Sequence, residues 1–515
     1  MLKDRVESFS SSASSNNEAV SNNRSSNSSN SLNILIVGPG MFFTKSHKNF
    51  VVSIAKTLAI EHTVTLLLTC IAHKDCEVKN SNPRLTPLYY YTTNKVLKTK
   101  FNNTKKASEI IADAWQLFIE LTKDDSQFYK QNLHGQTFDL GVMEPLKMNQ
   151  YSVALFHKLG IIKTVQIRAF SLFPQQYADI RDKNGNDLHD TSFAHVKSPG
   201  GDMFPGVDEI CRRTRMYFIN TQPEVEFLNG SMYEGYESVS MIGGIHMTEN
   251  AGALDTVLLS KIEKFENVVL FSFGTTDCAV TSMTDKRFQV ILKTIEDYQK
   301  HQPNYLFVWQ SYESDPKLKL LKARMASTSN DANDPDTLEN LYAMHWIQLQ
   351  TLLVQPVWKN VIYYLSFISE HPKLRTFVSH CGKNSQLEIA AAGKPLICVG
   401  IEYDQFYNAE AMAEKQTAIS LNFHINDGNH IDAFTTNALK LALIEALDLC
   451  SDEQDFFKSV RALYGGCKNR VDLEKVKSNG EKFRNRLEIP RGPEGTNGIQ
   501  KLILDKIKTI KGELK

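Results

Sequence analysis

Two long apolar runs, each followed by a glycine-containing loop, restrict the fold more than any other feature of the sequence. The first is Ile34-Leu-Ile-Val37, which leads into Gly38-Pro-Gly40, and the second is Val268-Val-Leu-Phe-Ser-Phe273, which leads into Gly274-Thr-Thr276. An uninterrupted apolar run is typical of a strand that is buried on both faces of a parallel sheet. Because helices must cover both faces of such a sheet, the two runs predict an α/β protein with two sheets.

The segments that follow each run complete this pattern. A helical pattern over 49–60 and an apolar run at 64–68 follow the first, as a βαβ unit requires. The second is followed by alternating elements, with strands expected at 304–309, 375–379 and 395–399 and helices at 285–299 and 384–392. A chain of 515 residues is too long for one compact core, which also favours two domains.

We expect four parts along the chain. The first thirty-one residues are rich in Ser and Asn and contain no apolar run, which predicts a disordered tail. The pattern breaks again near 247–266, where we expect the linker between the two domains. The expected parts are therefore a tail at 1–31, an N-terminal Rossmann-like domain at 32–250, a C-terminal Rossmann-like domain at 251–450 and C-terminal helices at 451–515.

The charge balance favours small-molecule chemistry. The 58 basic and 58 acidic side chains cancel, so the sequence gives no electrostatic reason to expect nucleic acid or an anionic membrane as a partner. No apolar run at the start resembles a signal peptide, and nowhere do about 18 apolar residues follow one another as a membrane-spanning helix requires. By these criteria we expect a soluble, cytoplasmic chain without a transmembrane segment.

The eight cysteines are scattered along the chain without a C-x-x-C pair of the kind that marks a zinc or redox site. We therefore expect free and mostly buried thiols.

The stretch from His371 to Asn408 is the most informative for function. It combines a strand, a small-residue turn and a helix, and the free amides at the start of that helix form an anion site with the helix dipole. Asn384 or Ser385 is expected to cap the helix, and Gly393 is expected to end it. Glu388 lies one helical turn after Asn384, so its carboxylate is placed to accept from two ribose hydroxyls.

This stretch resembles the signature of the UDP-glycosyltransferases, in the UDP-glucuronosyl- and UDP-glucosyltransferase type found in animals. The family pattern is His-Gly-Gly-x-Asn-Ser-x-x-Glu, followed by Gly-x-Pro and then Asp-Gln, and only Cys381 departs from it. The resemblance implies a GT-B fold, in which two Rossmann-like doubly wound domains face each other across a cleft. It also implies donor-binding roles: diphosphate for His380, Gly382, Asn384 and Ser385, ribose for Glu388, and sugar hydroxyls for Asp404 and Gln405.

Further segments extend the resemblance over about residues 33 to 450. The run at 268–275 is similar to the family's strand and phosphate-proximal loop, which implies that Thr275 also lies near the donor phosphates. Two more segments, Phe218-Ile-Asn-Thr-Gln-Pro-Glu-Val-Glu226 and Met241-Ile-Gly-Gly-Ile245, are similar to the end of the family's N-terminal domain.

The resemblance places a catalytic pair in the N-terminal domain. His47 follows the first strand at the sheet edge where open α/β folds bind their ligands, and the family uses a histidine here as the general base. Glu144 ends the strand pattern that starts at Phe138 and corresponds to the carboxylate that orients the base. From position alone, His47 is equally well read as a surface histidine and Glu144 as an ordinary strand-terminal acid. Asp139 lies at the wrong end of the strand.

The uracil site is the least regular part of the pattern. The segment starting at His345-Trp346-Ile-Gln348 resembles the family's Trp-x-Pro-Gln segment without its proline, which implies that Trp346 and Gln348 or Gln350 contact the base. In this register 354–370 is an insertion, and Trp358 is the rival aromatic residue.

Taken together, the resemblance implies an inverting transfer from UDP-glucose or UDP-glucuronate to a small lipophilic acceptor. It implies no metal or other cofactor, and the sequence has no clear Asp-x-Asp motif. A nicotinamide-dependent oxidoreductase is disfavoured because Phe43 stands where the dinucleotide fingerprint needs its third glycine. A catalytically impaired nucleotide-sugar-binding protein stays open, since Cys381, the lost proline, the insertion and the missing signal and anchor all depart from the family pattern. Animal members are often bound to the endoplasmic reticulum membrane, so the localisation also stays open.

Overall fold

The structure is a computed structural model. It describes residues 31–38, 45–70, 78, 80–91, 116, 119–123, 126–144, 151–169, 213–227, 238–248, 256–274, 283–311, 341–345, 373–401, 404–421, 424–426, 429–431, 434–488 and 498–512. The Ser- and Asn-rich segment 1–30 and the expected insertion at 354–370 lie outside these residues.

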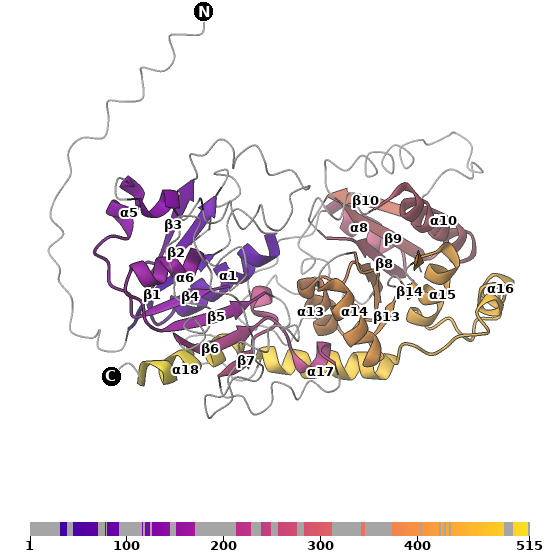
Figure 1. Cartoon of the computed structure of the whole chain (residues 1–515). Helices are drawn as coiled ribbons and strands as arrows, with labels where there is room; N and C mark the ends of the chain where they lie inside the picture. The colour runs from indigo at the N-terminus through magenta and orange to yellow at the C-terminus, as the bar shows by residue number, and fades with distance from the viewer. Residues whose placement is uncertain are drawn as a thin grey trace, which may run out of the picture.

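The first half of the chain forms a parallel sheet with the order β3-β2-β1-β4-β5-β6-β7 (Figure 1). The strand at Ile34–Val37 predicted from its apolar run is β1, and it lies in the middle, between β2 and β4. Its residues are almost all buried, as expected of a strand covered on both faces. The strands are β1 (Asn33–Gly38), β2 (Thr63–Cys70), β3 (Leu85–Tyr91), β4 (Leu140–Met143), β5 (Thr164–Arg168), β6 (Thr214–Ile219) and β7 (Val239–Met241).

The second half forms another parallel sheet, with the order β10-β9-β8-β11-β12-β13 (Figure 1). The second apolar run is β8, which again lies in the middle, between β9 and β11. The strands are β8 (Asn267–Ser272), β9 (Tyr305–Ser311), β10 (Leu341–His345), β11 (Leu374–Ser379), β12 (Leu396–Cys398) and β13 (Ala418–Ser420), and a small antiparallel pair is formed by β14 (His424–Asn426) and β15 (Asn429–Ile431).

Both sheets reverse their winding direction beside the central strand. The chain runs outward from β1 to β3 and then returns to the other side of β1 with β4, and β8 to β11 repeat this path. The loops that leave the two strands beside such a reversal diverge, so a ligand can reach the carboxyl edge of the sheet there. Each sheet therefore has one preferred place for a binding site, between β1 and β4 in the first sheet and between β8 and β11 in the second.

Helices cover the sheets, as the sequence pattern predicts. The helix expected at 49–60 starts earlier, because α1 already begins at Lys45, and the expected linker at 247–266 contains helix α8. The helices are α1 (Lys45–Leu58), α5 (Gln127–Asn132), α6 (Tyr151–Lys158), η3 (Pro223–Val225), η5 (Ile245–Thr248), α8 (Thr256–Lys264), α10 (Asp285–His301), α13 (Lys383–Ala392), α14 (Gln405–Glu414), α15 (Thr436–Ala446), α16 (Asp455–Leu463), α17 (Leu473–Glu488) and α18 (Gly498–Gly512).

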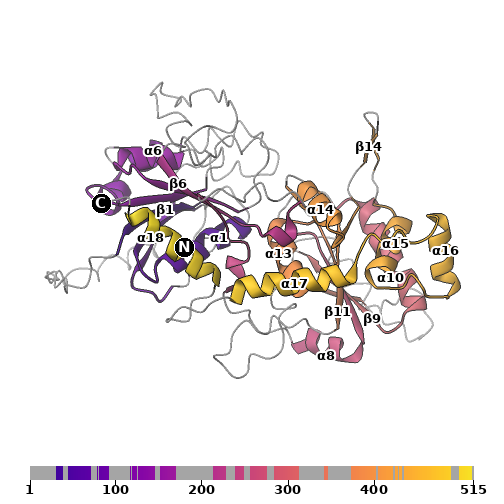
Figure 2. The ribbon, with the colours of Figure 1, turned by 90° about the horizontal axis from the view of Figure 1, so that it is seen from below.

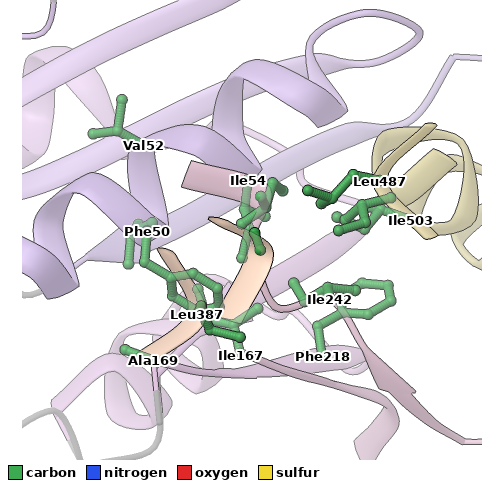
Figure 3. Close-up of a cluster of buried hydrophobic side chains, with 14 of the residues drawn as sticks. Phe50, Val52, Ile54, Ile167, Ala169, Phe218, Ile242, Leu387, Leu487 and Ile503 are labelled. Atoms are coloured by element: carbon green, nitrogen blue, oxygen red, sulfur yellow. The ribbon is translucent and has the colours of Figure 1, made fainter. Parts of the chain in front are cut away.

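The two C-terminal helices connect the halves. Figures 1 and 2 show α17 running beneath α13, and α18 lying against the first half beside α1 and β6. Leu487 of α17 and Ile503 of α18 join Phe50 of α1 and Leu387 of α13 in one buried cluster, drawn in Figure 3. Because this cluster contains side chains from both halves, apolar burial holds α1 and α13 in a fixed relation.

The prediction of free thiols is wrong for the five described cysteines, because Cys70 and two further pairs are disulfide-bonded. Disulfides join Cys381 to Cys398 and Cys450 to Cys467, with Cα atoms 5.3 Å and 6.1 Å apart. Each pair is separated by 17 residues, so the missing C-x-x-C spacing gave no indication of it. No helix within the described parts of the chain has the length and apolar character that a membrane crossing needs.

Candidate active site at the junction of the two sheets

His47 and Glu144 meet at the reversal point of the first sheet. His47 lies in the first turn of α1 after β1, and Glu144 directly follows β4, so the two neighbouring strands bring together residues that are 97 positions apart. The His47 Nδ1 atom lies 3.0 Å and 2.9 Å from the two Glu144 carboxylate oxygens. The Glu144 side chain is fully buried and that of His47 is 16% exposed. Asp139 lies at the opposite end of β4, where its carboxylate accepts from the backbone of Asn33.

The surroundings of the pair fix both its geometry and its charge. One Glu144 oxygen accepts the backbone N–H of Ala169 at 2.9 Å. Burial lowers the pKa of His47, but the Glu144 charge, the hydrogen bond to it and the more distant Asp404 outweigh burial, so this pKa is raised above 6.5. With Nδ1–H donating to Glu144, the lone pair of the neutral ring is on Nε2. A neutral ring held in this way can accept a proton at Nε2.

The helix at whose start the sequence predicts an anion site is α13, at the reversal point of the second sheet. The prediction that Asn384 or Ser385 caps this helix is wrong, because α13 already begins at Lys383. Its N-cap residue is Gly382, which has no side chain to cap the backbone N–H groups. The backbone N–H groups of the first turn have no acceptor within the helix, which leaves them for an anion. Gly393 ends the helix in the left-handed conformation, with φ of 64°, as predicted.

His380 lies between the second sheet and this helix, packed against two glycines. A ring nitrogen bonds to the backbone of Ser272, at the end of β8. A Cβ atom added at Gly274 would lie 2.7 Å from Nε2 of His380, and one added at Gly382 would lie 2.6 Å from it. Burial lowers the pKa of His380 to about 4, against the opposing effect of the Ser272 bond. His380 is therefore a neutral hydrogen-bonding group at physiological pH.

Gly274→Ala should displace the His380 ring and weaken binding of UDP, the nucleotide that the motif leads us to expect. We expect UDP affinity, measured by calorimetry, to fall about tenfold or more, the usual effect of losing one hydrogen bond to a charged group. Gly160→Ala is the matched control, because Gly160 also has a positive φ, of 70°, but an added Cβ there meets nothing within 4 Å. Equal UDP affinities for the two variants would contradict this packing argument.

Cys381 occupies the position where the family pattern has its first glycine. Its φ is 66°, in the left-handed region that glycine adopts without strain, which explains why glycine suits this turn. The turn is also held by Asn408, whose Nδ2 donates to the Cys381 carbonyl at 3.0 Å, and by the disulfide to Cys398. These contacts fix the backbone that leads into α13.

The remaining described donor-binding candidates surround α13 and α14. Glu388 lies in α13, and His246 of η5 brings its Nε2 to 3.3 Å from a Glu388 oxygen, with both side chains nearly buried. Asp404 precedes α14 and accepts from Asn408 Nδ2 at 2.8 Å, and Gln405 accepts the backbone N–H of Ile401 at 2.9 Å. Burial raises the pKa of Asp404 even though the Lys383 charge acts to lower it.

Several polar contacts between the halves were not predicted from the sequence. Besides the His246 contact, Lys383 Nζ lies 3.3 Å from an oxygen of Glu226, and Asn220 Nδ2 donates to Asn384 Oδ1 at 2.9 Å. Asn220 and Glu226 lie in the segment singled out for its resemblance to the family, but no local pattern indicates which groups they contact.

Some predicted site residues lie outside the described residues. They are Thr275, Trp346 and Gln348, together with the alternatives Gln350 and Trp358. Among the residues that are described, no group of three or more His, Cys, Asp or Glu side chains is arranged to hold a metal ion.

Comparisons with known proteins agree with this arrangement. The model of the UDP-glucoronosyl and UDP-glucosyl transferase family matches residues 206–445, which extend from before β6 into α15. Two Caenorhabditis elegans proteins named as UDP-glucuronosyltransferases, ugt-47 and ugt-46, are 26% identical over 216 residues and 27% identical over 271 residues. These matches cover 42% and 52% of this chain but only 33% and 43% of the relatives' own lengths.

Solved structures resemble nearly the whole chain. Arabidopsis thaliana UGT89C1, solved with UDP, aligns with a TM-score of 0.55 at 12% identity and covers 92% of this chain and 99% of its own. Glycyrrhiza uralensis UGT73P12, solved with glycyrrhetinic acid 3-O-monoglucuronide, aligns with a TM-score of 0.57 at 15% identity and covers 94% and 96%. At such low identity the likeness establishes the fold, which is the GT-B fold with two Rossmann-like sheets.

The fold alone leaves the family open, because many unrelated functions share one architecture. The family model adds evidence from the sequence, since the region that it matches contains the signature from His380 to Gln405 and the sheet that carries it. This match and the nematode relatives show that residues 206–445 carry a region of the UDP-glycosyltransferase family, similar to the animal type of UDP-glucuronosyl- and UDP-glucosyltransferases.

Proposed function

We propose that the protein transfers a hexosyl group from a UDP-sugar to a small lipophilic acceptor. The observation that carries this proposal is the closeness of a base from one half to the donor-binding elements of the other. His47 is paired with Glu144 in the first half, and Glu144 is linked through the backbone of Ala169 and the side chain of Asn220 to Asn384 of α13 in the second half. A glycosyl transfer needs both a base for the acceptor and an anion site for the leaving nucleotide.

The proposed mechanism is a direct displacement with inversion. His47 Nε2 accepts the proton of the acceptor hydroxyl while that oxygen attacks the anomeric carbon, and Glu144 stabilises the imidazolium that forms. The bond between the anomeric carbon and the donor phosphate oxygen breaks, and UDP leaves with the electron pair. The free amides at the start of α13 stabilise the negative charge that develops on the diphosphate.

The donor contacts follow the motif in this proposal. His380, Gly382, Asn384 and Ser385 bind the diphosphate with Thr275, Glu388 binds the ribose, Asp404 and Gln405 bind the sugar, and Trp346 with Gln348 binds the uracil. The first half, residues 32–250, then holds the acceptor, and residues 251–450 hold the donor.

A UDP-release assay tests the proposed function. The protein is supplied with UDP-glucose or UDP-glucuronate and a panel of phenols, and we expect release of UDP that depends on both donor and acceptor. Binding of UDP without release under any of these conditions would instead favour a catalytically impaired nucleotide-sugar-binding protein. Absence of UDP binding would exclude both functions.

The pH profile should report the raised pKa of His47. The base must be neutral to accept a proton, so kcat/KM should rise with pH. It should reach its plateau only above the pKa of His47, which is higher than 6.5. In Glu144→Gln the negative charge is lost, so the pKa of His47 should fall and the rising limb should move to lower pH. Initial rates between pH 5 and pH 9 with saturating donor measure this. A limb at the same pH in both proteins would contradict the assignment of Glu144.

A further inference from the structure

Asn220 links the two halves of the proposed site. It directly follows β6, its side chain is fully buried, and its Nδ2 makes two hydrogen bonds. One goes to the backbone carbonyl of Ala169 at 2.9 Å, and the other goes to Oδ1 of Asn384 in the second half, also at 2.9 Å. Ala169 in turn donates its N–H to Glu144, so a continuous set of contacts leads from the base pair to α13.

The chemistry of these contacts fixes how both amides are turned. The Ala169 carbonyl can only accept, so the Asn220 atom beside it must be the NH₂ group. This group donates its second hydrogen to Asn384, so the Asn384 atom that receives it must be the oxygen. The NH₂ group of Asn384 is therefore turned away from Asn220, and no acceptor for it occurs among the described residues.

The side-chain oxygen of Asn220 takes no part in these hydrogen bonds, in contrast to its NH₂ group. Asn220 Oδ1 is buried and accepts no hydrogen bond from the described residues. A buried acceptor without a partner is unfavourable. The position therefore uses the two hydrogens of the Asn220 amide, which aspartate could not supply.

We propose that Asn220 is a positioning residue that turns the Asn384 amide so that its NH₂ group faces the donor diphosphate. This inference rests on the proposed function, because it needs a diphosphate beside Asn384. Phosphate oxygens only accept hydrogen bonds, so an NH₂ group attracts them and a carbonyl oxygen repels them. A reversed Asn384 amide would thus replace an attraction with a repulsion at the same place.

Asn220→Asp tests this inference, because a carboxylate of nearly the same shape can only accept and would turn the Asn384 amide over. The affinities for UDP and for uridine are measured by competition against a fluorescent UDP analogue. We expect the affinity for UDP to fall about tenfold or more, the loss of a hydrogen bond to a charged group, with the affinity for uridine nearly unchanged. The readout is the affinity for UDP divided by the affinity for uridine, since uridine lacks the diphosphate.

Gln222→Ala is the matched control. Gln222 is also buried in the segment after β6, but it donates to the Gly243 carbonyl and not to Asn384. Its variant should keep the wild-type ratio. If Asn220→Asp does not fold, Asn220→Ser replaces it, with a reduced ratio again expected because the serine side chain is too short to keep both contacts.

The coupling of the two residues gives a second test. In an Asn384→Ala background, substitution of Asn220 should leave the ratio unchanged, because the group that it positions is absent. A wild-type ratio in folded Asn220 variants, or an equal loss for UDP and uridine, would overturn the inference while leaving the proposed function intact. A wild-type protein that binds no UDP would overturn both.

Discussion

His47→Ala should lower kcat for UDP release roughly 100- to 10,000-fold, the usual contribution of a general base. Alanine cannot accept the acceptor's proton, and the Glu144 carboxylate, fully buried behind the ring, would lose the group that it orients. We expect the affinity for UDP to change little, because the proposed role of His47 is to accept the proton of the acceptor and not to bind the donor. Single-turnover rates and calorimetry with UDP measure the two quantities separately.

His134→Ala is the control for this experiment. His134 is exposed after α5, contacts Tyr129, and precedes the end of β4 that is opposite to Glu144. Its variant should keep the wild-type rate. A wild-type rate in His47→Ala would remove His47 from the mechanism, whereas an equal loss of rate and of UDP affinity would assign it a structural role.

Glu226→Ala should lower the free energy of unfolding by about 3–5 kcal/mol, the cost of leaving a buried charge without its partner. The side chains of Glu226 and Lys383 are 1% and 3% exposed, with 3.3 Å between the Lys383 Nζ atom and the nearer carboxylate oxygen. Thr221 also donates to Glu226, and the Tyr407 hydroxyl donates to it at 2.9 Å. Urea unfolding followed by circular dichroism measures the change.

Glu474→Ala provides the comparison. Glu474 also forms an ion pair, with Lys477 at 3.0 Å, but its side chain is 85% exposed. Solvent screens such pairs, so this variant should change stability by less than about 1 kcal/mol. Equal effects of the two substitutions would show that the Glu226 carboxylate is not needed to compensate Lys383.

Local patterns were sufficient for much of the fold. Apolar runs predicted the central strands β1 and β8, because a strand buried on both faces has no polar positions. Helix ends were less accurate: α13 begins at Lys383 because Gly382 takes the N-cap position, although Asn384 and Ser385 are better capping residues by type.

The candidate site divides in the same way. The spacing from His380 to Gln405 was readable because one strand, one turn and one helix carry most of it. The pairing of His47 with Glu144 was expected only through the resemblance, and the disulfide of Cys381 with Cys398 was not expected at all. Contacts of this kind join residues from different elements.

By itself, the sequence determined the alternation of buried strands with helices and the small-residue turn before α13, since hydrophobic periodicity and turn chemistry act within a few residues. Only the tertiary structure decided which side chains meet at the junction: Glu144 with His47, Glu226 with Lys383 and Asn220 with Asn384. The order of strands around β1 and β8 and the shared buried cluster of α1 and α13 fix those contacts, and both arise from burial of apolar surface between segments far apart in the chain.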